Sequence, residues 1–224
     1  LPGNQQTQIR NAIKNYVQTS KAINTDARAD PDTSSQNVLN LDAALQAILQ
    51  QIKANDQTNE RIVYRSIDYD GDVKTIPYGT RVKVGDYVGD LGFVSTSEHR
   101  QFILGKEHQG EVTGLLKLAI YGRSGVPIAL HFIEGSQRSY TNPNEKAMYD
   151  IYEDKKSELI QVWNKWFGPG ARAGQAEILF PRDTVFQVKK IAPPDDDTVS
   201  VVLEEFAGPR PASVKNMKFG DPLK

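Results

Sequence analysis

The chain has 224 residues, of which 38% are hydrophobic and 25% charged, as in an ordinary globular protein. Its 27 Lys and Arg against 28 Asp and Glu give a net charge of -1, so no overall basic field indicates nucleic acid. Cysteine is absent, which excludes disulfides, thiolate catalysis and cysteine-ligated zinc. No apolar run reaches the roughly 20 residues of a membrane span. The start, LPGNQQTQ, has neither an initiator Met nor a signal-peptide core, which favours a fragment of a longer polypeptide.

Hydrophobic spacing divides the chain into three parts. Residues 1–57 are expected to be helical, because apolar residues recur at helical spacing after Ile9 and again after Leu41, with Asn40 as the N-cap of the second helix. Residues 61–206 are expected to be mainly β, with a helical insertion at 145–167. The strand-like stretches are RIVYRSI, GFVSTS, GLLKLAIYG, GVPIALHFI, AEILF, VFQVKKIA and TVSVVLEEF. The Pro-rich end, 207–224, is expected to be a tail that is wrapped on the surface or disordered.

Several familiar motifs are excluded by their context. GPGARA at 168–173 matches a permissive dinucleotide fingerprint, but it follows a helix and opens a strand, which is the wrong order. DYDGD at 68–72 begins like a calcium loop, yet Gly79 stands where the closing glutamate belongs, so a hairpin turn is favoured. The three histidines lack the spacing of metal ligands. The sequence therefore predicts no metal site, and without G-x-S-x-G it is no ordinary hydrolase.

The stretch GQAEILFPRD places Glu177 inside an apolar strand, where a carboxylate is costly unless it is solvated or used. Glu177 is therefore either a solvated edge residue or a functional one. Two other polar pieces precede it in the chain: Arg65 at the end of one strand, and the Ser-Thr-Ser of 95–97 at the end of another. Gln175 and Glu177 stand at the entry of a third strand. Each piece alone is typical of a polar surface.

In this order, the pieces resemble the Arg…Ser-Thr-Ser…Glu mono-ADP-ribosyltransferase toxins, which use NAD as a substrate. The resemblance covers 9–206 and is carried by AIKNYVQTSKAIN, LDAALQAIL, VKVGDYVGDLGFVSTS, GLLKLAIYGRSGVPI and AGQAEILFPRDTVFQV, the last similar to the catalytic turn of the Rho-modifying exoenzymes. It implies an α+β ADP-ribosyltransferase fold: two packed, mainly antiparallel β-sheets with N-terminal helices and a helical insertion, in a single catalytic domain, 1–224. NAD would lie in the cleft between the sheets.

The resemblance also implies the roles of individual residues. Glu177 would be the catalytic carboxylate, with Gln175 beside it and Ser95 orienting it. The expected contacts to NAD are Arg65 on the phosphates, Thr96, Ser97, Tyr16, Asn24 and Gly92.

Gln175 and Arg172 bear on the acceptor. In the family, Glu at the Gln175 position accompanies arginine acceptors, so Gln implies another acceptor: protein Asn or Gln, or a nucleic acid, especially structured RNA. Arg172 stands where the exoenzymes carry an aromatic residue, which departs from a Rho-type target and is compatible with a phosphate-bearing acceptor, although a solvated loop charge is the simpler interpretation. A third alternative is a catalytically silent interaction module.

The partners implied are a macromolecular acceptor and, for a toxin used between bacteria, an immunity protein. The resemblance implies a secreted bacterial effector, delivered into a target cell as the C-terminal part of a larger polypeptide. Neither a membrane nor an oligomer is indicated, so a monomer is expected.

Overall fold

The computed structural model describes residues 3–29, 35–54, 59–69, 73–97, 115–128, 177–195 and 198–223. The chain divides into two units. The first consists of 1–59, 92–95 and 124–182, and the second of 60–91, 96–123 and 183–224. The division passes through the Ser-Thr-Ser motif, between Ser95 and Thr96. The predicted helical insertion at 145–167 lies outside the described residues.

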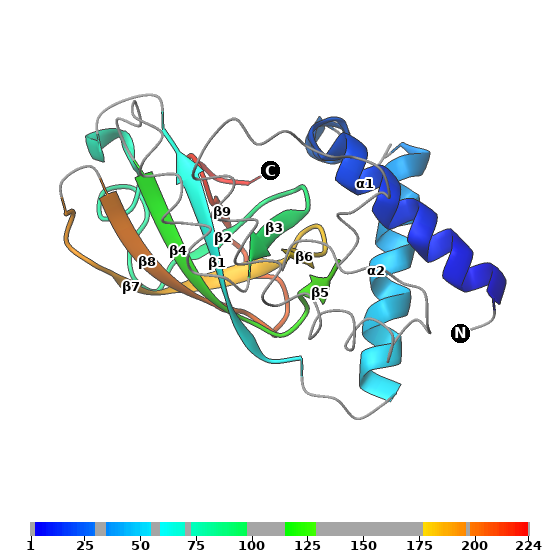
Figure 1. Ribbon diagram of the computed structural model, residues 1–224. Coiled ribbons are helices and arrows are strands. Elements are labelled where there is room, and N and C mark those ends of the chain that lie inside the picture. Colours follow the sequence, from blue (N-terminus) through cyan, green and yellow to red (C-terminus); the bar gives the residue numbers. More distant parts are fainter. Residues whose placement is uncertain are drawn as a thin grey trace, which may run out of the picture. The chain divides into compact units, whose positions relative to one another are not determined.

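Two long helices make up the N-terminal part of the first unit, as the sequence predicts: α1 (Gly3–Ala29) and α2 (Gln36–Ala54). They lie side by side (Figure 1). The apolar stripe of α2 is buried from Val38 onward, and the helix begins at Gln36. The prediction of Asn40 as its N-cap is therefore wrong. Val38 extends the stripe by one turn, and the carbonyl of Ser35 accepts the N–H of Leu39 at 3.1 Å.

Helix α1 is kinked at Thr19, whose backbone leaves helical geometry at φ -134° and ψ 28°. The Thr19 hydroxyl donates to the carbonyl of Asn15 at 2.8 Å, a side-chain bond of the kind that bends helices. Apolar residues on both sides of the kink are buried, among them Ile13, Tyr16 and Ile23. The kink lies between Tyr16 and Asn24, the two helical residues that the family resemblance predicts to contact the nucleotide.

The strands of the first unit are short. Strands β5 (Val126–Pro127) and β6 (Glu177–Phe180) pair antiparallel, and the strand order is β5, β6, β3 (Val94–Ser97), of which the first two residues belong to this unit. The hydrophobic core of the unit joins the apolar faces of α1 and α2 to Phe93, Val126, Ile128 and Leu179.

The second unit is built on a sheet in the order β3, β1 (Arg61–Asp68), β4 (Leu115–Gly122), β8 (Thr198–Glu205), β7 (Val185–Ile191), β2 (Tyr87–Gly89), β9 (Lys215–Asn216). A 3₁₀ turn, η1 (Val73–Thr75), follows β1. The pairs β4–β8 and β2–β9 are parallel and the others antiparallel. Figure 1 shows β1, β4, β8 and β7 as long neighbouring strands. Helices and a mixed sheet confirm the predicted α+β class.

One face of this sheet is an apolar ladder. Ile67, Leu116 and Val199 are neighbours across β1, β4 and β8, and Val63, Ile120 and Leu203 form a second row of the same kind. All six side chains are buried. The sequence analysis expected the strand to end near Arg65. It continues to Asp68 because Ile67 belongs to the first of these buried rows.

The C-terminal residues join the second unit. Strand β9 pairs with β2, and Val214 and Met217 on its two sides are buried. The Tyr78 hydroxyl donates to the carbonyl of Met217 at 3.1 Å. Part of the tail expected at 207–224 is therefore ordered β structure, held by the buried side chains of Val214 and Met217. A strand of two residues is too short to be predicted from a sequence pattern.

Candidate active site

Glu177 is the first residue of β6, the strand entry at which the sequence analysis placed it. The three residues after it, Ile178, Leu179 and Phe180, are all fully buried. The strand is therefore buried on both faces after Glu177, and Leu179 enters the core shared with the helices. Since β6 also lies between β5 and β3, Glu177 is not a residue of a free sheet edge.

Ser95 holds the side chain of Glu177. Its hydroxyl donates to Oε1 of the carboxylate across 2.5 Å, and both side chains are partly buried. The Glu177 carbonyl accepts the N–H of Ile128 at 3.0 Å, so backbone and side chain are both fixed. A hydroxyl that donates to an ionised carboxylate forms a charge-assisted hydrogen bond. The first unit thus brings together two of the three residues predicted to be catalytic.

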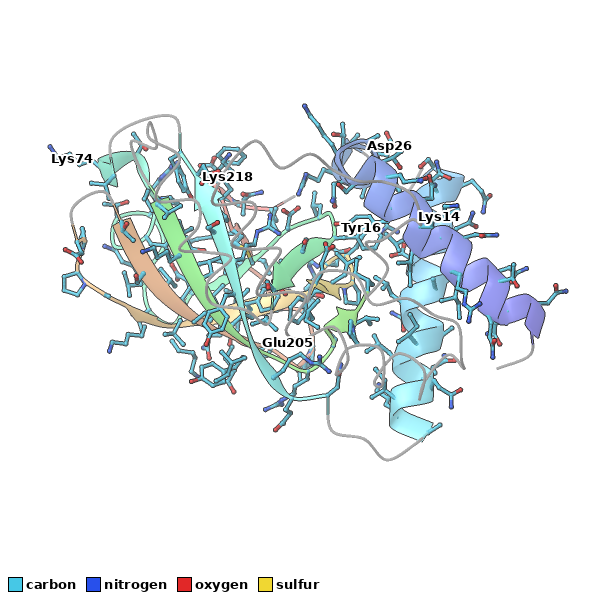
Figure 2. All side chains as sticks on the ribbon, viewed as in Figure 1. Lys14, Tyr16, Asp26, Lys74, Glu205 and Lys218 are labelled. Atoms are coloured by element: carbon cyan, nitrogen blue, oxygen red, sulfur yellow. The ribbon has the colours of Figure 1, made fainter. Side chains whose placement is uncertain are left out.

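Tyr16 and Asn24 contact the segment that leads into Ser95. The Asn24 side chain accepts the N–H of Phe93 at Oδ1, across 2.8 Å, and donates from Nδ2 to the Tyr16 hydroxyl, across 3.3 Å. The Tyr16 ring packs edge-on against Phe93, with ring centroids 6.0 Å apart. Tyr16 is only 2% exposed, whereas Lys14 on the same helix is exposed (Figure 2).

Gly92 allows this close approach of helix and strand. A Cβ atom at Gly92 would lie 2.7 Å from Oδ1 of Asn24 and 3.3 Å from Nε of Arg28, the first of these closer than real Cβ contacts allow. The family resemblance also predicts that Gly92 contacts the nucleotide. Gly92 lies in the first unit, as do Tyr16 and Asn24.

Arg65, Thr96 and Ser97 belong to the second unit. Ser97 pairs with Tyr64 in the β3–β1 register, next to Arg65. Arg65 lies between Val63 and Ile67 in the alternation of β1, opposite Leu118 of β4, and is partly buried. Thr96 and Ser97 are 5% and 9% exposed. A guanidinium on the apolar face of a sheet is costly unless an anion or hydrogen bonds stabilise it.

Gln175 and Arg172, the residues predicted to concern the acceptor, lie outside the described residues. Among those that the structure describes, no group of His, Cys, Asp or Glu could hold a metal ion. In the same part of the chain, no helix is long and apolar enough to cross a membrane.

Sequence reasoning missed some of the contacts that support β6. Asn59, 9% exposed, donates to the carbonyl of Gly125 at 2.7 Å, just before β5. A Cβ at Gly125 would lie 2.4 Å from the Ile178 side chain, so this glycine lets β5 approach β6. At the other end of β6, the Arg182 guanidinium forms an ion pair with Asp42 of α2. The printed sequence marks Gly125 only as a turn residue, and nothing in it pairs Arg182 with Asp42.

A groove of about 680 Å³ lies on the second unit, where the exposed Ile62 and Tyr121 are paired across β1 and β4. Its lining includes three cationic residues and two carboxylates: Arg123 contacts Glu60 at 3.2 Å, Lys189 contacts Glu204 at 2.9 Å, and Arg61 also lines the groove.

Solved structures are similar to this chain over most or all of its length. The Vis toxin, an ADP-ribosyltransferase from Vibrio splendidus, is 14% identical with a TM-score of 0.52, covering 100% of this chain and 83% of that one. Vis in complex with agmatine has the same score and identity, over 100% and 85%. Exoenzyme S from Pseudomonas aeruginosa, in complex with human 14-3-3 protein beta and bound to carba-NAD, is 17% identical with a TM-score of 0.50, over 89% and 74%. The predicted ADP-ribosyltransferase fold is confirmed.

No curated protein matches the sequence. The family model described as ADP-ribosyltransferase exoenzyme, however, matches residues 4–206, which is most of the chain. The family resemblance inferred from the motifs is thereby confirmed, and so are the enzyme class and NAD as the substrate. The chain belongs to the ADP-ribosyltransferase exoenzyme family and is an NAD-using mono-ADP-ribosyltransferase.

Proposed function

We propose that this enzyme is a toxin that transfers ADP-ribose from NAD to asparagine or glutamine of a protein, with Glu177 as the catalytic residue. The observation that carries the assignment of Glu177 is its contact with Ser95: a carboxylate at the entry of a buried strand, oriented by a hydroxyl 2.5 Å away. A solvated surface glutamate has no need of such a partner. Residues 1–224 act as one catalytic domain in this proposal.

The chemistry explains why a single carboxylate suffices. The bond from ribose C1′ to the nicotinamide nitrogen breaks, its electron pair leaves with the ring and neutralises the pyridinium, and a bond from C1′ to the acceptor nitrogen forms as that nitrogen loses a proton. No acid is needed to protonate the leaving group. Positive charge develops on the sugar, as in glycoside transfer. Glu177 would accept the ribose 2′-hydroxyl and stabilise that charge, and Ser95 would hold the carboxylate in the required direction.

Three residues of the second unit, Arg65, Thr96 and Ser97, are proposed to bind the nucleotide. Arg65 supplies a planar guanidinium, which matches phosphate oxygens with paired hydrogen bonds. Its place on an apolar sheet face supports this role, because burying a guanidinium there is costly unless an anion or hydrogen bonds stabilise it. Thr96 and Ser97, both buried, support the strand and the nicotinamide end.

Gln175 determines the choice of acceptor in this proposal. A carboxylate at this position could pair with a guanidinium and deprotonate it, whereas the amide of Gln175 carries no charge and cannot act as that base. The Vis neighbour was solved with agmatine, a guanidinium compound. We therefore expect this enzyme, unlike one adapted to guanidinium acceptors, to leave agmatine unmodified and to modify a side-chain amide.

A nucleic-acid acceptor is the second candidate. Gln175 is equally compatible with a base or a ribose hydroxyl, and Arg172, three residues earlier, supplies a positive charge suited to a phosphate backbone. For both acceptors the proposed biological setting is the same: a secreted bacterial effector that acts inside a target cell and is neutralised in the producer by an immunity protein. It is expected to act as a monomer.

Labelled NAD added to a whole-cell lysate tests the proposal. Label that protease removes and nuclease leaves supports the protein acceptor, and mass spectrometry of the labelled peptides should then place ADP-ribose on asparagine or glutamine. Label that survives protease but not nuclease, or transfer to agmatine, would overturn it. Absence of both label and released nicotinamide would favour the silent module.

A further inference from the structure

Asn24 lies on α1, eight residues after Tyr16, and contacts the segment that carries Ser95. We propose that Asn24 is a positioning residue: it fixes the backbone at Phe93 and thereby holds the Ser95 hydroxyl against Glu177. This role differs from a direct contact with the nucleotide, which the family resemblance implies for Asn24. It rests on the catalytic role proposed for Glu177 above.

The orientation of the Asn24 amide follows from its partners. The N–H of Phe93 can only donate, so the atom 2.8 Å from it must be the amide oxygen. The amide nitrogen then faces the Tyr16 hydroxyl at 3.3 Å and donates to it. Both ends of the amide are thus directed at protein groups, and a rotation of the side chain would break both bonds together.

Packing restricts the two partners as well. Tyr16 is 2% exposed and Phe93 1% exposed, and their rings meet edge to face at an interplanar angle of 66°. This is a favourable aromatic geometry, and neither ring has solvent into which it could turn. The Tyr16 hydroxyl is therefore a fixed acceptor for Asn24.

Gly92 supplies an independent observation. The backbone there runs so close to Asn24 that a Cβ would lie 2.7 Å from the amide oxygen. The carboxamide therefore lies directly against the backbone of residues 92 and 93, and the sequence leaves room for it with a glycine.

A fixed Phe93 matters because Ser95 is only two residues further along. Phe93 directly precedes β3 and Ser95 is the second residue of that strand, so the bond from Asn24 to Phe93 fixes the backbone where the strand that carries Ser95 begins. The bond from Ser95 to Glu177 spans 2.5 Å. Hydrogen bonds weaken steeply with distance and angle, so a shift of a fraction of an ångström would weaken the hold on the carboxylate.

Positioning and nucleotide contact predict different kinetics for nicotinamide release from NAD, an assay that needs no acceptor. A residue that only positions Ser95 affects the transition state, so its loss lowers kcat and leaves KM for NAD nearly unchanged. A residue that binds the nucleotide directly raises KM when it is removed. We therefore expect Asn24→Ala to lower kcat about two- to tenfold, the range of one neutral hydrogen bond.

Two further variants sharpen the test. Asn24→Asp keeps an oxygen for the N–H of Phe93 and should retain most of kcat, whereas a contact with NAD phosphates would make this added negative charge raise KM. Thr25→Ala is the matched control, because the exposed Thr25 hydroxyl donates only to the carbonyl of its own helix at Lys21, across 2.8 Å. It should behave as wild type.

A double variant tests the path through Ser95. If Asn24 acts by holding Ser95, then Asn24→Ala should lower kcat no further in a Ser95→Ala background. A full additional loss there, a raised KM with normal kcat, or unchanged kinetics in Asn24→Ala would each overturn the proposal. Should Asn24→Ala fail to fold, Gly92→Ala displaces the same amide, and the same kcat and KM criteria decide. A fully active Glu177→Gln would instead refute the proposed function itself.

Discussion

Replacing Ser95 by alanine isolates the contact on which the proposed mechanism depends. The change removes one hydroxyl, 2.5 Å from the Glu177 carboxylate, and leaves the strand backbone intact. A hydrogen bond to a charged group contributes about 1.5–3 kcal/mol. If that contribution is fully present only when the carboxylate faces developing positive charge, kcat for nicotinamide release falls about ten- to hundredfold at an unchanged KM for NAD.

The assay is single-substrate release of nicotinamide, measured with thermal unfolding of the same samples. Ser200→Ala is the matched control, because Ser200 is an exposed serine of a strand in the other unit and its loss should change neither quantity. A correctly folded Ser95→Ala enzyme with wild-type kcat would refute the reasoning. So would a Ser95→Ala effect that persists in full in a Glu177→Gln background, because the hydroxyl would then act on something other than the carboxylate.

Three other changes have defined outcomes. Glu177→Gln should reduce nicotinamide release more than any neighbouring change, by at least about a hundredfold, measured at saturating NAD. Asp42→Asn should lower the unfolding temperature, because it leaves the largely buried Arg182 guanidinium without its carboxylate, at a cost of about 1–3 kcal/mol. The Lys215 ammonium, 2.6 Å from Asp86, lowers the pKa of that carboxyl chiefly by its hydrogen bond. Its stabilisation, about 0.2–1 kcal/mol, is therefore present at neutral pH and lost as pH falls below 4, so the stability difference between wild type and Lys215→Met should shrink in acid unfolding curves.

The long elements of the fold follow from the sequence because they repeat one pattern several times. The stripe of α2 and the alternation of β4 each involve several turns or pleats, enough to identify the element. Strands β2 and β9 have three and two residues, too few for a period, and are defined by pairing: β2 with β7, and β9 with β2. The start of α2 was misplaced for a related reason: Asn40 has the chemistry of an N-cap, but the buried Val38 decides where the helix begins.

In the candidate site, too, the sequence predicts what a pattern along the chain displays and not what depends on a single tertiary contact. Glu177, Ser95 and Arg65 were found from motif order, which a sequence displays directly. The contact between Asn24 and Phe93 was not found, because it joins residues 69 positions apart through one amide and one backbone N–H. No periodicity records such a bond.

The chemistry of the reaction explains why such supporting contacts carry weight in this enzyme. Nicotinamide leaves as a neutral molecule, so catalysis has no proton transfer to the leaving group to accelerate and depends on where one carboxylate stands relative to the sugar. In the first unit that carboxylate is held by Ser95 at its side chain and by Ile128 at its carbonyl. Helix α1 contacts this arrangement indirectly, because Asn24 accepts the N–H of Phe93, two residues before Ser95. If Glu177 and Asn24 have the roles proposed above, α1 is part of the catalytic geometry, and a substitution at Asn24 should lower kcat before it changes NAD affinity.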